Sequence, residues 1–164
     1  MRAWPTSYSP QTKLLYIPAL TNCVTVAIDH AKHSKETGWG GGNSNIAERI
    51  ESSLIAADPV TGEVKKGAHM RYPIFSGTLV TGGGVVFLGL LDGTVAAFDD
   101  TTLDQLWKIN VGSGFSAPPM TFEVNGKQYV AIVSGPSPVS KRRIIHTPEL
   151  QEQRNALVLY VFGL

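Results

Sequence analysis

The acidic side chains are the first candidates for chemistry in this sequence. Asp99 and Asp100 are adjacent, and Asp92 precedes them by a short apolar run. Clustered carboxylates can act as a general base or hold a hard cation such as Ca²⁺. However, adjacent strand residues point to opposite faces of a sheet, and all three aspartates lie in stretches typical of turns. We therefore expect these aspartates to be structural or solvated.

The metal-binding residue types do not form a recognisable motif. Among the four histidines, His30 and His33 are three residues apart, while His69 and His146 stand alone. Two ligands do not make a zinc site, which takes at least three protein ligands. The only cysteine is Cys23, which excludes an intrachain disulfide and a cysteine-based zinc site. We expect the histidine pair to lie in a solvated loop.

Two further stretches are a glycine-rich segment and a short basic run. Gly38–Asn45 reads GWGGGNSN, but it lacks the Lys-Ser/Thr ending and the apolar helix of a phosphate-binding loop. Ser140–Arg143 reads SKRR, a short basic run of the kind found in solvated loops. The net charge of +1 gives no electrostatic reason to expect a nucleic-acid partner.

The elements around these residues read as short strands. The chain has 164 residues, of which 43% are hydrophobic, and its apolar runs are bounded by Gly, Pro, Asp or Asn. Asn125-Gly126 and Asp92-Gly93 are the strongest hairpin signals. No apolar run approaches a membrane span, and the N-terminus lacks the apolar stretch of a secretory signal. As given, the sequence predicts a cytoplasmic protein without a membrane span.

One sequence frame occurs twice. Asp92–Gly112 reads DGTVAAFDDTTLDQLWKINVG, and Ser52–Gly67 reads SSLIAADPVTGEVKKG, so that Asp58 precedes Asp99 by 41 positions. Four-stranded units with a period of about 40 residues are typical of a β-propeller. In such a unit the aspartate would accept hydrogen bonds from turn amides, and Trp107 would be buried flat between blades. We expect four consecutive antiparallel strands from Gly77 to Val111. The alternative is a β-sandwich.

Two stretches could hold helix. Ser44–Ser53 could form a turn or two. Thr147–Ala156 has Thr147 as a candidate cap, with Pro148 at the first helical position.

Gly83–Gly135, with its Asp-to-Trp frame, resembles the C-terminal blades of the pyrroloquinoline-quinone (PQQ)-dependent alcohol dehydrogenases. Trp4–Cys23 (WPTSYSPQTKLLYIPALTNC) and Leu157–Leu164 (LVLYVFGL) are similar to other stretches of the same family. The resemblance fails mainly in His30–Glu51 and Pro136–Asn155, which read as loops. It implies an all-β fold, a partial β-propeller of two to three four-stranded blades from an eight-bladed quinoprotein ring.

The resemblance divides the chain into repeat units of about 14–70, 77–112 and 117–164 within one C-terminal propeller fragment, 1–164. In the family the catalytic aspartate and the ligands of Ca²⁺ or a lanthanide ion belong to upstream segments, so we assign no catalytic and no metal-binding residue here. The resemblance implies a periplasmic family that uses PQQ as its cofactor. We expect the fragment to be inactive by itself.

Two segments resemble parts of the family that lie near the cofactor. Tyr72–Gly77 (YPIFSG) aligns with a stretch that often reads Trp-Gly-Gly, so Phe75, Ser76 and Gly77 become candidate cofactor-binding residues. Val133–Pro138 (VSGPSP) aligns with a loop that often continues Gly-Gly-Trp, which adds Gly135 and Pro136. Both segments lack the family's tryptophan. The alternative is that Phe75 is a core residue and Gly135 a turn residue.

Two or three blades cannot close a ring, and their terminal faces would expose large apolar patches. We therefore expect an upstream polypeptide or self-association to cover these faces. The alternatives to an enzyme fragment are a non-catalytic interaction module, which would use the same faces, and a decayed gene product.

Overall fold

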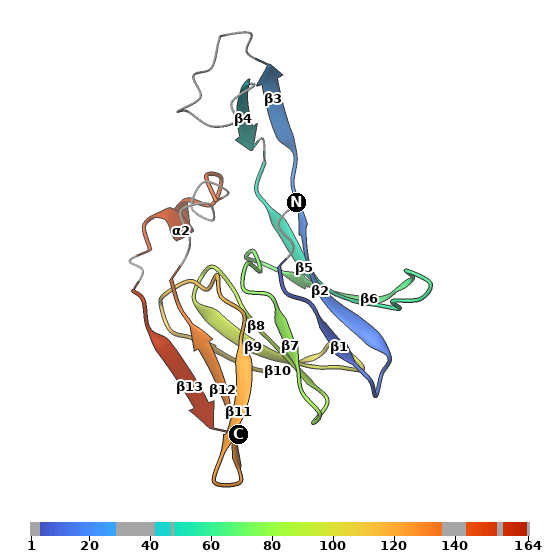
Figure 1. Cartoon of the computed structure of the whole chain (residues 1–164). Coiled ribbons are helices and arrows are strands. Elements are labelled where there is room, and N and C mark those ends of the chain that lie inside the picture. The colour runs from blue at the N-terminus through green and yellow to red at the C-terminus, as the bar shows by residue number, and fades with distance from the viewer. Residues whose placement is uncertain (1–3, 29–41, 47, 136–143, 154–155, 164) are drawn as a thin grey trace, which may run out of the picture.

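A computed structural model describes residues 4–28, 42–46, 48–135, 144–153 and 156–163 (Figure 1). Over these ranges the chain is built almost entirely of antiparallel strands, so the predicted all-β fold is confirmed. None of the helices in the described part is long and apolar enough to cross a membrane.

The first sheet combines strands from both sides of a long insertion. Its order is β1-β2-β5-β6, and every neighbouring pair is antiparallel. Its members are β1 (Ser7–Ser9), β2 (Leu14–Thr21), β5 (Glu51–Ala57) and β6 (Val64–Met70). The insertion carries a separate hairpin of β3 (Val24–Ile28) and β4 (Gly42–Ile46), which extends away from the other sheets (Figure 1).

The second sheet consists of four consecutive strands. It contains β7 (Thr78–Val80), β8 (Val85–Gly89), β9 (Thr94–Asp99) and β10 (Gln105–Asn110), each antiparallel to the next. The four strands predicted between Gly77 and Val111 are therefore confirmed.

The third sheet has three strands in the described residues. It contains β11 (Met120–Val124), β12 (Lys127–Val133) and β13 (Leu159–Gly163). Asn125 and Gly126 join β11 to β12 with φ angles of 53° and 75°, as a type I′ turn requires.

The two copies of the repeated frame form the same turn. Asp99 Oδ1 accepts hydrogen bonds from the N–H groups of Thr101 and Thr102, at 2.9 and 2.8 Å. Asp58 Oδ1 accepts equivalent bonds from Val60 and Thr61, at 2.8 and 3.2 Å. The predicted role of the aspartate as a turn residue between the third and fourth strands is confirmed.

The main core lies between the first two sheets. Tyr16 and Leu54 of the first sheet pack with Val86, Leu88 and Phe98 of the second, and all five are buried. Buried polar groups cross the same interface, because the Ser9 hydroxyl donates to Asp100 Oδ2 at 3.2 Å. The two sheets are therefore held face to face by apolar packing and by specific hydrogen bonds.

The burial and orientation of the Trp107 ring differ from the prediction. It remains 39% exposed, and its ring meets Phe162 edge-on, with centroids 5.4 Å apart and an interplanar angle of 72°. The expectation of a flat, buried tryptophan is wrong for this chain. Trp107 lies on β10, the last strand of its sheet, and the neighbouring sheet ends at β13 in the described residues, without a fourth strand to cover it.

The helix predicted over Ser44–Ser53 is also wrong. Its described residues belong to β4, a short bend and the start of β5, because cross-strand pairing outweighs their weak helical propensity. The second predicted helix is short: α2 covers Pro148–Gln151, with Pro148 at its start, and Thr147 makes no side-chain capping bond.

Candidate functional site

The connections divide between the two ends of the sheets. Tight turns join β1 to β2, β5 to β6, β7 to β8, β9 to β10 and β11 to β12 at one end. The strand ends that lead from β2 to β5, β6 to β7, β10 to β11 and β12 to β13 lie at the other end, where α2 and the β3–β4 hairpin are found (Figure 1). The short turn between β8 and β9 lies at this end as well. Binding residues are commonly carried on long loops that a rigid scaffold positions. The long-loop end is therefore the candidate functional end.

Phe75 lies in the loop between β6 and β7 at this end. It has no exposed surface, and its ring stacks on Trp4 with centroids 4.9 Å apart and an interplanar angle of 21°. A second core, separate from that between the sheets, surrounds it. The buried members of this loop-end cluster are Ile50, Phe75, Leu91, Ile144 and Leu150.

Ser76 and Gly77 are held tightly by their neighbours. The Ser76 hydroxyl lies 2.9 Å from the carbonyl oxygens of Gly77 and Gly89, and it accepts the Gly89 N–H at 2.8 Å. Gly77 has a φ of 88°, and a Cβ there would lie 2.8 Å from the Pro5 oxygen. Only glycine fits this position, and the capacity of Ser76 for hydrogen bonds is used within the protein.

Gly135 connects to the same end through a chain of close contacts. Its N–H donates to the Gly114 oxygen at 2.7 Å, and its φ is 126°. A Cβ on Gly114 would lie 2.4 Å from the oxygen of Leu91, which belongs to the loop-end cluster with Phe75. The structure thus brings both predicted segments to one end of the sheets. Pro136 lies outside the described residues.

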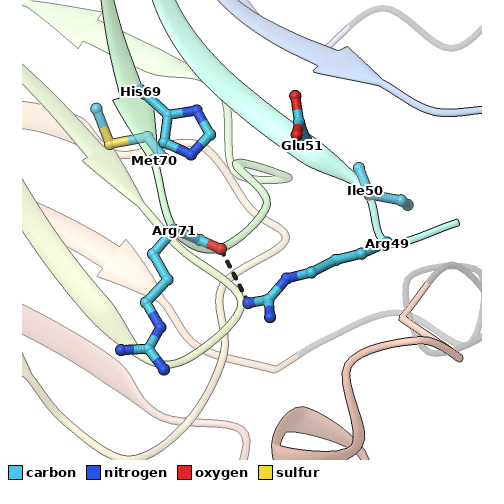
Figure 2. A pocket seen from close by; sticks show the side chains of 6 residues that line it. All are labelled: Arg49, Ile50, Glu51, His69, Met70 and Arg71. Carbon is cyan, nitrogen blue, oxygen red and sulfur yellow. Dashed lines mark hydrogen bonds between the residues drawn. The ribbon is translucent and has the colours of Figure 1, made fainter.

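A pocket at this end was not predicted from the sequence. It has a volume of about 270 Å³ and lies where β5 begins and β6 ends (Figure 2). It is lined by Arg49, Ile50, Glu51, His69, Met70 and Arg71. The signal that could have found it is the pair of arginines that flank these two strands.

The arginines of the pocket are arranged around Tyr72. The guanidinium carbons of Arg49 and Arg71 lie 5.6 and 5.3 Å from the centre of its ring. Arg49 also donates to the Arg71 carbonyl oxygen at 3.2 Å, as Figure 2 shows, and its Nη2 lies 3.5 Å from Glu149 Oε1. Glu51 and Glu149 offset the two cations, so the pocket has no strong net charge.

The acidic groups of the repeated turns lie at the opposite end. Hydrogen bonds from the amides of Thr102 and Thr101 lower the pKa of Asp99, and equivalent bonds lower the pKa of Asp58. Within the described ranges, no three His, Cys, Asp or Glu side chains are grouped as a metal site would require. The turn carboxylates of Asp99 and Asp58 are therefore separated from the long-loop end, where the pocket and the loop-end cluster lie.

Comparisons of sequence link the chain to one group of enzymes. The family model described as glucose/ethanol/alcohol dehydrogenase, beta-propeller domain, matches residues 54–130. Quinoprotein ethanol dehydrogenase of Pseudomonas putida is 37% identical over 80% of this chain and 22% of its own length. The 1-butanol dehydrogenase (quinone) of Thauera butanivorans is 41% identical over 80% of this chain and 21% of its own length.

Comparisons of structure lead to the same group. A europium-containing methanol dehydrogenase matches 98% of this chain with a TM-score of 0.86 and 28% identity, over 32% of its own length. The quinohemoprotein alcohol dehydrogenase of Comamonas testosteroni matches 98% of this chain with a TM-score of 0.81 and 30% identity, over 25% of its own length. The chain spans about a fifth of the length of the curated relatives that it matches.

Proposed function

This chain is a relative of the quinoprotein alcohol dehydrogenases in sequence and in fold, and we propose that it supplies the C-terminal blades of such an enzyme's β-propeller. In this role it contributes to an oxidoreductase that acts on alcohol groups, but it does not turn over by itself. The observation that carries the proposal is that 80% or more of the chain matches only 22–32% of each relative's length.

The long-loop end supplies part of the wall of the cofactor chamber. We assign Phe75, Ser76, Gly77 and Gly135 to this wall, together with Pro136. Phe75 and Ser76 have no exposed surface, and the Ser76 hydroxyl is engaged by Gly77 and Gly89. These residues do not fit as direct hydrogen-bond partners of PQQ in this arrangement. They would set the position of the wall, while upstream blades would supply the contacts to PQQ and the Ca²⁺ or lanthanide ion.

An upstream polypeptide is the partner that the exposed surfaces favour. On the third sheet, Leu159 and Val161 of β13 are 62% and 48% exposed, on the face of the strand opposite to Tyr160 and Phe162. On the first sheet, Tyr8 is 49% exposed. The first two sheets have four strands each and the third has three in the described residues, so a strand from the partner would complete the third sheet beside β13.

Fragment complementation tests the proposal. The chain is co-expressed with a polypeptide that covers the upstream blades of a quinoprotein alcohol dehydrogenase, and PQQ is added with Ca²⁺ or a lanthanide ion. Alcohol-driven reduction of a dye is then measured for the chain, for the upstream polypeptide and for the pair. We expect turnover from the pair only. Turnover by the isolated chain, or a stable pair that binds PQQ but remains inactive, would refute the proposed function.

A further inference from the structure

Residues 144–152, which contain α2, are attached to the rest of the protein in an unusual way. Each main-chain hydrogen bond that this segment forms within the described structure stays inside it, as for Leu150 N–H to the Thr147 oxygen. The strands, in contrast, are joined to one another by continuous ladders. We call residues 144–152 the strap.

The strap is held to the sheets by a few side chains. His146 Nε2 lies 2.7 Å from the Ile46 oxygen, and Glu149 lies 3.5 Å from Arg49. Both side chains of this ion pair are more than 40% exposed, so water weakens their attraction. The main attachment is therefore apolar, through Ile144 and Leu150, which are each 5% exposed.

The strap covers the aromatic pair of the long-loop end. Ile144 and Leu150 pack in the same cluster as Phe75, and Trp4 packs against that cluster from its edge. This cluster is distinct from the core between the first two sheets. Removal of the strap would uncover Phe75 and Trp4 without breaking a single ladder hydrogen bond.

We propose that the strap opens as a unit while the sheets stay folded, and that its opening gives access to the wall formed by Phe75 and Trp4. Segments that are held by few buried contacts and no shared ladder open at a lower free energy than core strands. The purpose that we assign to this opening, control of access to the cofactor chamber, rests on the proposed function. The opening itself does not.

Native-state hydrogen exchange of the full chain tests the opening. In the wild type we expect the Leu150 amide to exchange faster than amides of β8 and β9, with a denaturant dependence smaller than that of global unfolding, because strap opening exposes less surface. Leu150→Ala should speed exchange in the strap at least ~30-fold, because it removes a buried side chain. Glu149→Gln should accelerate amide exchange in the strap by no more than about 5-fold, because an exposed ion pair contributes little to stability. Amides of β8 and β9 should remain slower than those of the strap in both variants, because they exchange only when the sheets also unfold.

Acrylamide quenching of Trp4 provides the second readout, in a background with Trp39→Phe and Trp107→Phe. Both strap variants should increase the quenching. The matched control is Lys65→Gln, which removes the exposed Lys65–Glu63 pair at the tight-turn end and should leave the strap unchanged. The proposal is overturned if the strap exchanges only together with β8 and β9. If Leu150→Ala does not fold, exchange and quenching in Glu149→Gln test the proposal instead. None of these measurements depends on the cofactor or on turnover.

Discussion

The hydroxyl of Tyr16 donates a 2.6 Å hydrogen bond to the main-chain oxygen of Asp100, which joins the first sheet to the second. The same hydroxyl lies 2.8 Å from Thr12 Oγ1, so its hydrogen-bonding capacity is met although Tyr16 is fully buried. A buried polar group with this geometry fixes one relative position of the two sheets, whereas apolar contacts alone would tolerate sliding.

Tyr16→Phe should therefore destabilise the protein by about 1–2 kcal/mol, because it leaves the buried Asp100 oxygen without this donor. The measurement is equilibrium unfolding in urea, by circular dichroism. Tyr8→Phe is the matched control, since Tyr8 is 49% exposed, and it should change stability by less than about 0.5 kcal/mol. Equal effects of the two substitutions would contradict the role of the buried hydroxyl.

Stability should fall at alkaline pH because of the same residue. Burial raises the pKa of Tyr16, and the nearby carboxylates of Asp100 and Asp99 raise it further, against the Thr12 hydrogen bond. Above the unfolded pKa of about 10, the unfolded chain loses this proton first. Folding stability should then decrease as the pH rises through the folded pKa.

Unfolding in urea over this alkaline range measures the effect. Tyr16→Phe should have a flatter profile than the wild type, while Tyr8→Phe should retain the wild-type slope. A slope in Tyr16→Phe as steep as that of the wild type would assign the pH dependence to other groups.

Local sequence patterns were sufficient to predict the turns and the second sheet. The Asp99 turn follows from side-chain chemistry that operates over three residues, and Asn125-Gly126 follows from backbone φ preference. The β3–β4 hairpin could not be predicted in the same way, because β4 reads GNSNI and has little intrinsic strand propensity. Only its pairing with β3 makes it a strand.

The candidate site illustrates a second limit of the sequence. The resemblance to the PQQ-dependent alcohol dehydrogenases made Phe75 and Gly135 candidate residues. No local pattern indicates that Phe75 stacks on Trp4, which lies 71 positions earlier in the sequence. The Arg49–Arg71 pocket is equally non-local, because it depends on the register of β5 against β6. Contacts between distant segments are set by the sheet topology, which single residues do not encode.

Asp99→Asn and Asp99→Ala should separate geometry from charge in the repeated turn. The asparagine can still accept the amide hydrogen bonds of Thr101 and Thr102, so we expect it to keep the turn, whereas alanine should lose it and destabilise the protein. The lowered pKa of Asp99 means that its contribution is present above the unfolded pKa and is lost as pH falls through the folded value. Thermal unfolding between about pH 6 and 2 should show a flatter profile for Asp99→Asn than for the wild type.

Gly62→Ala should destabilise the protein by about 1 kcal/mol through backbone strain alone. Gly62 has a φ of 74°, and a Cβ there would meet no atom within 4 Å. The matched control is Gly82→Ala, because Gly82 also has open space but not the positive φ. Urea unfolding should show no loss for Gly82→Ala. An equal loss for both would mean that the strain at Gly62 is not the cause.

Trp107 should report the binding of the upstream polypeptide that we propose as a partner. It is 39% exposed and lies close to β13, whose outward side chains are also exposed, so a strand added beside β13 would remove water from the indole. In a background with Trp4→Phe and Trp39→Phe, the emission of Trp107 should shift to shorter wavelength when the upstream polypeptide binds. A reporter in place of Val60, which is 91% exposed at a tight turn, gives the control. With Val60→Trp and Trp107→Phe in that background, the emission should not shift. If a complex forms and Trp107 emission stays unchanged, the partner does not complete the third sheet, and the assembly must use another face of the chain.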